Sequence, residues 1–254
     1  DEARRTVACS IGAKPEEIFF TSGGTESDNW AILGSAFANQ DAGRHIVSSQ
    51  IEHHAVLHPL KLLEACGFTV TYLAPDGDGR ISPEAVEEAI RPDTILVSVM
   101  SANNEVGTME PVREIGQICR RHGILFHTDA VQAYAHVPID VGEAKIDLLS
   151  ASAHKFGGVP GAGFLYATRG APLSPLIRGA QEHGYRGGTE NVPATLSMAA
   201  ALEGATDTVV ISFIDLYRKV QRNFPEARVL SREDRLLLGK EMVQIAAAHG
   251  MILV

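Results

Sequence analysis

Thr94–Met100 (TILVSVM), Val112–His122 (VREIGQICRRH) and Leu125–Asp129 (LFHTD) follow one another at the centre of the chain. The first and third stretches are short and apolar, which predicts buried strands. The second has the spacing of an amphipathic helix that ends before Gly123. A strand, a crossover helix and a second strand are the unit from which parallel sheets are built. These residues therefore predict an α/β fold.

The same alternation of short apolar runs and helical patterns extends from this centre in both directions. Further strands are predicted at Glu17–Thr21, His45–Ser49, Thr69–Leu73, Leu148–Ser150 and Gly163–Tyr166. Further helices are predicted at Thr25–Ala38, Val56–Ala65 and Val192–Glu203, and from a capping Ser82 onward. We expect a mainly parallel sheet flanked by helices, in which ligands bind beyond the carboxyl ends of the strands.

The alternating pattern ends at about residue 203. Residues 1–203 are predicted to form one large domain. Residues 204–254 contain one β run, Thr208–Ile214, and two helical patterns, Asp215–Arg222 and Arg232–His249. This segment is shorter than most domains, so we predict an incomplete smaller C-terminal α+β segment.

The composition argues against several classes of protein. A net charge of -9 over 254 residues argues against nucleic-acid binding, which needs clustered Lys and Arg. No apolar run approaches the roughly 20 residues that span a bilayer, and the stretch Asp1–Arg5 has no apolar signal core. We expect a cytoplasmic protein. Cys9, Cys66 and Cys119 are too far apart for a disulfide framework or a zinc site, and the helical patterns around the last two predict buried thiols.

Two glycines and a threonine follow the first predicted strand, in the turn Thr21–Glu26 (TSGGTE). Gly23 and Gly24 let the backbone approach a ligand, the next helix offers free N–H groups, and Thr25 adds a hydroxyl, which together suit a phosphate. A plain strand-to-helix turn capped by Thr25 explains the turn equally well when it is taken alone.

Further polar residues follow three other strands. His53 could stack on a flat ligand or, with His58, form half of a metal site, but no third ligand is evident and no metal is expected. Asn104 could bind a carboxylate or a ring oxygen, although Asn-rich turns are common. Asp129 could face a pyridinium nitrogen or cap a helix, and Gln132 could reach the phenolic oxygen of the same ring.

Lys155 follows a strand and small residues, an unusual setting for a surface lysine. Burial there would lower the pKa of its amine and allow a Schiff base, while Ser152 and His154 could donate to a phosphate. A solvated lysine remains the alternative. The ordered set of phosphate turn, stacking His, strand-end Asp and later Lys describes a pyridoxal-phosphate (PLP) site. A dinucleotide enzyme would need a G-x-G-x-x-G motif, and the sequence contains none after a strand.

Six stretches of the chain, in order, resemble the NifS/IscS-like cysteine desulfurases of the class V aminotransferase group, which are fold-type I PLP enzymes. They are Phe20–Asn29 (FTSGGTESDN), Glu52–Leu57 (EHHAVL), Asn103–Gly107 (NNEVG), His127–Gln132 (HTDAVQ), His154–Phe156 (HKF) and Gln181–Asn191 (QEHGYRGGTEN). The resemblance covers about residues 3–203. Any one motif is modest, but the ordered run is specific.

The resemblance implies a role for each matching residue. Lys155 would carry PLP and move the substrate's Cα proton, Asp129 would pair with the ring nitrogen, and His53 would stack on the ring and act as an acid–base partner. The remaining cofactor residues implied by the family are Gly24, Thr25, Asn104, Gln132, Ser152 and His154. Thr189 would reach the phosphate of the neighbouring subunit, which implies a homodimer.

The family activity converts L-cysteine to L-alanine and an enzyme persulfide, and passes the sulfur to an acceptor or scaffold protein for iron–sulfur clusters or other pathways. Three features depart from the family. The family's N-terminal start is absent, no cysteine follows Cys119, and the carboxylate-binding Arg-x-Ser strand has no counterpart. The turn Gly157–Gly161 also lacks the usual Pro-Lys pair. Either the sequence is an incomplete record of a desulfurase or it is a truncated, non-catalytic homologue.

Another class V PLP enzyme is the alternative to a desulfurase. A C–S lyase, a selenocysteine lyase or an aminotransferase needs no enzyme-borne thiol, which suits the absence of a late cysteine. Arg186–Asn191 (RGGTEN) resembles the desulfurase branch more closely. An intact Lys155 and Asp129 argue against a non-catalytic subunit, which would need neither.

Overall fold

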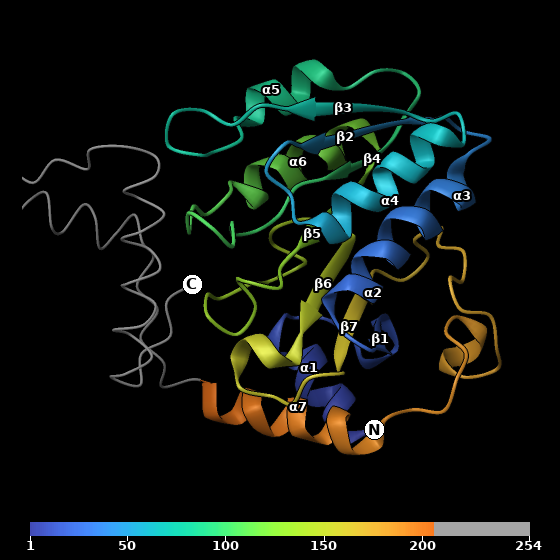
Figure 1. Ribbon diagram of the computed structural model, residues 1–254, viewed down its shortest axis with the longest axis vertical. Coiled ribbons are helices and arrows are strands. Elements are labelled where there is room, and N and C mark those ends of the chain that lie inside the picture. The colour runs from blue at the N-terminus through green and yellow to red at the C-terminus, as the bar shows by residue number, and fades with distance from the viewer. Residues whose placement is uncertain (206–254) are drawn as a thin grey trace, which may run out of the picture.

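Seven strands form one mixed sheet in the computed structural model, which describes residues 1–205 (Figure 1). Their order across the sheet is β1-β7-β6-β5-β4-β2-β3. The strands are β1 (Ile18–Thr21), β2 (His45–Ser49), β3 (Thr69–Leu73), β4 (Thr94–Ser98), β5 (Leu125–Asp129), β6 (Leu148–Ser152) and β7 (Gly163–Ala167). Every predicted strand within these residues is present, with ends that shift by one or two residues.

The sheet is mainly parallel, as predicted. Strands β3, β2, β4, β5 and β6 run parallel, with pairs such as Leu96 with Leu125 and His127 with Leu148. Strand β7 is antiparallel to both β6 and β1. The reason is the short connection between β6 and β7, since a parallel return needs a crossover of a dozen or more residues.

Within residues 1–205, the helices include all those predicted and one α-helix that was not. They are α1 (Glu2–Ser10), α2 (Gly24–Asn29), α3 (Ser35–Asn39), α4 (His54–Ala65), α5 (Pro83–Ala89), α6 (Val112–His122) and α7 (Val192–Ala205), with shorter turns η1 (Pro15–Glu17), η2 (Trp30–Gly34), η3 (Ala153–Phe156) and η4 (Glu182–Gly184). The predicted helix Thr25–Ala38 is α2, the π-helical turn η2 and α3 in one continuous run, because the junction residues keep helical backbone angles. Helix α1 was not predicted.

The residues predicted to begin and end helices, Ser82 and Gly123, do so in the structure. Ser82 caps α5 by accepting a hydrogen bond from the Ala85 amide at 3.3 Å. Gly123 ends α6 with φ +68°, a left-handed conformation that glycine adopts without strain. The prediction for Cys66 is wrong, because this residue is the C-cap of α4 and its side chain is exposed, whereas Cys119 is buried as predicted.

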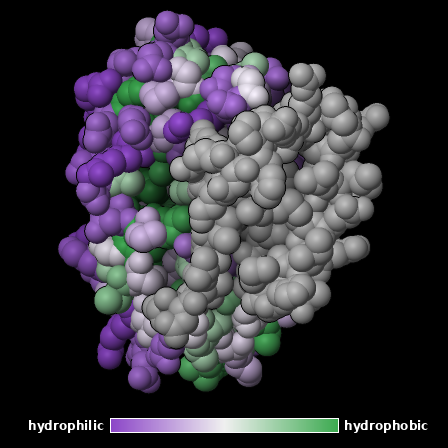
Figure 2. All heavy atoms as spheres, turned by 90° about the vertical axis from the view of Figure 1, so that its left-hand side faces the viewer, coloured by the Kyte–Doolittle hydropathy of each residue, from purple (hydrophilic) through white to green (hydrophobic). Residues whose placement is uncertain are grey.

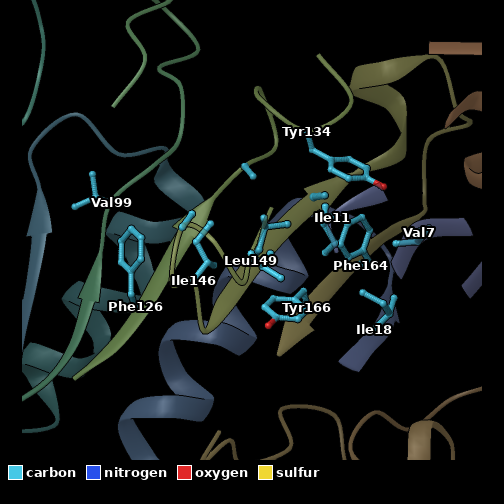
Figure 3. Close-up of a cluster of buried hydrophobic side chains, with 14 of the residues drawn as sticks. Val7, Ile11, Ile18, Val99, Phe126, Tyr134, Ile146, Leu149, Phe164 and Tyr166 are labelled. Carbon is cyan, nitrogen blue, oxygen red and sulfur yellow. The ribbon is translucent and has the colours of Figure 1, made fainter. Parts of the chain in front are cut away.

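Successive residues of each strand point to opposite faces of the sheet and enter two separate cores. Val47, Val97 and Leu149 pack with helices α1, α5, α6 and α7 on one face, in the core that Figure 3 shows. Ile46 and Leu96 pack with η2, α3 and α4 on the other face. Because side chains buried on both faces fix the register of a strand, the strand ends are held at one edge of the sheet.

The C-terminal predictions fall at the edge of what the structure describes. Helix α7 lies beside α1 (Figure 1), and the predicted boundary after residue 203 falls within its last turn. The predicted strand Thr208–Ile214 and the helices Asp215–Arg222 and Arg232–His249 lie outside the described residues.

The surface of the described residues is mostly polar where it can be seen. On the face in Figure 2, hydrophilic residues occupy much of the coloured surface, with hydrophobic residues among them. Within residues 1–205, no helix has both the length and the apolar character needed to span a bilayer. In the same residues, no three His, Cys, Asp or Glu side chains are grouped as metal ligands.

Candidate active site

The carboxyl ends of several strands open into one pocket of about 310 Å³, a size that suits a small organic ligand. Nine of the ten predicted site residues line it, and only Thr189 does not. The lining residues are Gly24, Thr25, Asp28, His53, Met100, Asn104, Asp129, Val131, Gln132, Ser152, His154 and Lys155. The parallel sheet thus brings together residues that are up to 131 positions apart in the sequence, from 24 to 155.

The turn between β1 and α2 forms one end of the pocket. Gly23 has φ +150°, and a side chain on Gly24 would come within 2.5 Å of Val131 Cγ2, so both positions suit glycine. The Ser27 amide donates to the Gly23 carbonyl at 3.1 Å, which starts the helical run that continues to Asn39. The first amides of this run have no acceptor within the helix and can serve an anion together with the Thr25 hydroxyl.

The end of β6 completes the same side of the pocket. Ser152 Oγ lies 2.9 Å from His154 Nδ1, which fixes the two side chains relative to each other. Burial and the Lys155 charge lower the pKa of His154. His136 Nε2 donates to the Lys155 carbonyl at 3.0 Å and holds the backbone of the 3-10 turn that presents the lysine.

Asp129 forms the buried end of the pocket. Its side chain is 5% exposed, and its Oδ1 accepts a hydrogen bond from the Val131 amide at 2.9 Å. Burial raises the pKa of this carboxyl, while the Val131 hydrogen bond and the charge of Lys155 oppose the rise. A buried acid with no ion-pair partner among the described residues is the complement that a protonated ring nitrogen requires.

His53 lies at the start of α4, where its ring is held by the backbone. Its Nδ1 accepts a hydrogen bond from the Ala55 amide at 3.1 Å, so the proton of the neutral ring sits on Nε2. Beneath it, Glu52 Oε1 accepts from Ser49 Oγ at 2.5 Å and from the Met100 amide at 3.0 Å. Burial raises the pKa of Glu52 to about 8.

The two neighbouring asparagines after β4 have different environments. Asn103 is buried, donates to the Ile51 carbonyl at 3.0 Å and accepts from the amides of Glu105 and Val106. It therefore shapes the loop, while the exposed side chain of Asn104 lines the pocket. Gln132 lines the pocket from the turn after β5.

Thr189 lies outside the pocket, on an exposed loop that is tied to the pocket's edge. Arg186 makes a bidentate ion pair with Glu26, with Nε–Oε1 at 2.7 Å and Nη2–Oε2 at 3.0 Å. Glu26 Oε2 also accepts from the Ser22 amide at 2.9 Å. The loop of Thr189 is thus fixed to the phosphate-side turn, while the role predicted for Thr189 in a neighbouring subunit stays a prediction.

Three pocket residues were not predicted from the sequence: Asp28, Met100 and Val131. Asp28 lies three residues after Thr25 on a helix, so both share one helical face, and that spacing was the available signal. Met100 contributes through its position after β4 and carries no chemical motif. Val131 fills the space against Gly24, a contact between segments that local sequence does not reveal.

Comparison with known families identifies the group to which this pocket belongs. A family model for aminotransferase class-V matches residues 1–247. This chain belongs to the class-V aminotransferase family. The predicted resemblance to NifS/IscS-like cysteine desulfurases is confirmed by its curated relatives. The chain is 57% identical over 205 residues to cysteine desulfurase IscS of Methanosarcina thermophila, and the match covers 80% of this chain and 51% of that protein.

A second relative and two solved structures agree with this class-V assignment. The putative cysteine desulfurase IscS 1 of Bacillus subtilis is 55% identical, over 80% of this chain and 54% of that protein. The chain thus spans about half the length of the curated relatives it matches. A structure of SspA in complex with cysteine aligns with TM-score 0.77 at 46% identity, covering 80% of this chain and 59% of that one. DndA from Streptomyces lividans aligns with TM-score 0.81 at 35% identity, covering 96% and 77%.

The class-V family implies pyridoxal phosphate, and the pocket of this chain fits that group. One end has helix amides and hydroxyls for a phosphate, with a close approach at Gly24 that a Cβ would block. The other end has the buried carboxyl of Asp129 for a ring nitrogen, and Lys155 supplies an amine within the same pocket. Phosphate donors, an amine and a buried acid are the complement of this cofactor.

Proposed function

We propose that this chain forms the cofactor-binding part of a PLP-dependent cysteine desulfurase that releases sulfur from L-cysteine as a persulfide and yields L-alanine. The observation that carries the proposal is the shared pocket of Lys155 and Asp129, in a chain more than half identical to proteins named cysteine desulfurase. A solved relative described as SspA in complex with cysteine supports cysteine as the substrate.

The chain's own residues would divide the binding of the cofactor between them. Lys155 would hold it covalently, Asp129 would keep a proton on the ring nitrogen, and His53 would cover one face of the ring. Gln132 would bond the ring oxygen. The phosphate would be held by Gly24, Thr25, Ser152 and His154.

Bound in this way, pyridoxal phosphate supplies an electron sink for the carbanion at the substrate's Cα. Asn104, exposed at the pocket mouth, would orient the substrate carboxylate. The amine of Lys155 would remove the proton at Cα, and the His53 Nε2–H would serve as an acid–base partner. Both groups are held in place by backbone hydrogen bonds, Lys155 through its carbonyl and His53 through Nδ1.

The sulfur acceptor must be a thiolate that can enter the pocket. It attacks the substrate sulfur, so the S–S bond forms while the C–S bond breaks and its electron pair and a proton go to the carbon that becomes alanine. Cys9, Cys66 and Cys119, all within the described residues, do not line the pocket. Burial raises the pKa of Cys119 to about 12, which keeps it protonated.

The absence of a described cysteine from the pocket lining favours a second function, C–S lyase or selenocysteine lyase, because neither reaction needs an enzyme thiol. The products formed from L-cysteine separate the desulfurase from the C–S lyase. Incubation of the holoenzyme with L-cysteine and a reducing thiol is expected to give alanine and sulfide, and Lys155→Ala is expected to abolish turnover. Lys61→Ala, on the exposed surface of α4, is the matched control. Pyruvate and ammonia in place of alanine would contradict the desulfurase proposal.

We also infer a homodimer with shared sites, which would pass its sulfur to an acceptor or scaffold protein. The loop of Thr189 is anchored at the pocket's edge but Thr189 itself is exposed, and Leu176, Ile177 and Tyr185 nearby in sequence are exposed apolar residues. Mixed dimers of Lys155→Ala and Thr189→Ala protomers test this. If Thr189 acts across the interface, one of the two sites in the mixed dimer carries both defects and the other neither, so activity returns on mixing. A monomer in sedimentation would contradict it.

A further inference from the structure

A second carboxyl group lies beside Asp129 in the pocket. Asp28, on α2, lines the pocket and is 1% exposed. Asp129 lines the same pocket and is 5% exposed, and its charge helps to raise the pKa of Asp28. Two carboxyl groups can hydrogen bond to each other only if one of them carries a proton, because an ionised carboxylate has no donor. The Asp28–Asp129 pair is therefore expected to hold one proton, because two neighbouring buried carboxylates would repel each other if both were ionised.

The surroundings of the two carboxyls decide which of them holds that proton. Asp129 receives the Val131 amide at 2.9 Å and the favourable charge of Lys155, both of which stabilise its ionised form. Asp28 has less support: its Oδ1 is buried and has no hydrogen-bond partner among the described residues. These differences favour the ionised form of Asp129 and the protonated form of Asp28.

The other groups around Asp28 do not reverse this order. On β5, His127 Nε2 lies 3.6 Å from Asp28 Oδ1, too far for a hydrogen bond, and burial lowers the pKa of His127 to about 3, so the ring is neutral. On β6, Ser150 lowers the pKa of Asp28, which only partly offsets the burial. After β2, Glu52 adds a carboxyl of the same sign. Burial and like charge together raise the pKa of Asp28 well above its usual range.

We propose that Asp28 is a positioning residue, a neutral acid that donates a hydrogen bond to Asp129 and keeps that carboxylate ionised against the ring nitrogen of the cofactor. The inference rests on the proposed function, since Asp129 faces a ring nitrogen only when pyridoxal phosphate is bound. A hydrogen-bond donor to a carboxylate reduces its affinity for a proton. The proton between ring and Asp129 then stays on the ring, where it strengthens the electron sink.

Two substitutions of Asp28 separate this role from a merely structural one. Asp28→Asn retains a donor in the same place, through its amide N–H, while Asp28→Leu removes the donor at similar volume. In holoenzyme loaded with ¹⁵N-labelled pyridoxal phosphate, the ring nitrogen resonance is expected to be that of a protonated ring in wild type and Asp28→Asn. In Asp28→Leu it is expected to move toward the neutral ring, with kcat falling about tenfold and KM little changed. A ring resonance in Asp28→Leu equal to wild type would overturn the proposal.

A second measurement does not require the leucine variant to fold. In the infrared spectrum of the wild-type protein at pH 7, the C=O stretch of a protonated carboxyl should include a component that Asp28→Asn removes. Glu52→Gln, which alters another buried acid, must leave that component in place. If Asp28→Asn removes no protonated-carboxyl band, the proposal fails. Wild-type protein that binds no cofactor would instead contradict the proposed function, and the infrared band would still decide whether Asp28 holds the proton.

Discussion

The two ends of the pocket differ in burial and in the kind of group that they present. At the ring end, Asp28 and Asp129 are buried carboxyls with Glu52 close by, and burial raises the pKa of all three. At the phosphate end, Thr25 and His154 are exposed and work beside backbone amides. The difference supports the proposed function with a division of labour, in which the buried end would set the protonation of the ring and the open end would supply affinity for the cofactor.

The largest effect is expected from Asp129→Asn at the buried end. The amide cannot carry the charge that holds the ring nitrogen protonated, so we expect kcat to fall on the order of 100-fold, about 3 kcal/mol in activation free energy, while the cofactor stays bound. Turnover of L-cysteine and the visible absorbance of the holoenzyme measure the two quantities separately. Full activity in Asp129→Asn would remove the distinction between the two ends.

A second test of the buried end uses the pH dependence of stability. The pKa of Glu52 is raised from its ordinary 4.5 to about 8 in the folded protein. At pH values between these two, the folded state therefore binds a proton that the unfolded state lacks. Stability from this group is therefore lost as pH rises from about 4.5 to about 8. Between pH 6 and pH 9, we expect the free energy of unfolding of Glu52→Gln to fall by less than that of wild type, with a difference on the order of 2 kcal/mol. Denaturant unfolding at each pH measures it. Glu16→Gln, at an exposed site, should leave the profile unchanged.

The open end should affect binding more than chemistry. Thr25→Val removes one hydroxyl from the phosphate site at similar volume, and we expect the dissociation constant for pyridoxal phosphate to rise about tenfold. At saturating cofactor kcat should stay within about twofold of wild type. Equilibrium binding followed by absorbance measures the dissociation constant, and saturation kinetics measure kcat. A kcat that falls as far as in Asp129→Asn would show that the open end also controls the chemistry.

The smallest effect is expected from Arg186→Met, which breaks the ion pair with Glu26 behind the phosphate turn. Arg186 is partly exposed and does not line the pocket, so its loss should weaken cofactor binding by only a few-fold. Equilibrium binding of pyridoxal phosphate, followed by absorbance, measures this loss of affinity. High salt should shrink the effect only slightly, because the two side chains are 19% and 11% exposed and partly buried pairs are weakly screened; an effect that disappears in high salt would contradict a role through this pair.

The sequence predicted most of the sheet and the helices that connect its strands, because each strand is a short apolar run with turn residues at its ends. It missed α1, a nine-residue helix with only three buried residues, Ala3, Val7 and Ala8, to mark its inner face. It also could not show that β7 returns antiparallel, since direction depends on the length of the connection and on pairing with β1.

The candidate site was predictable where it consists of strand ends. His53, Asp129 and Lys155 each follow an apolar run, and a parallel sheet gathers such positions at one edge. The proposed partnership of Asp28 with Asp129 was not predictable, because it depends on α2 packing on the sheet at β6, the neighbour of β5. Roles that need a second chain, as for Thr189, lie beyond what one chain's packing decides.

The account depends on a covalent bond between Lys155 and the cofactor. Reduction of the purified protein with borohydride fixes such a Schiff base, and peptide mass mapping then locates it. We predict the mass of a reduced pyridoxyl phosphate on the peptide that contains Lys155 and on no other lysine. A modification on Lys14, Lys61 or Lys145, or an unmodified Lys155 in protein that binds the cofactor, would contradict the account.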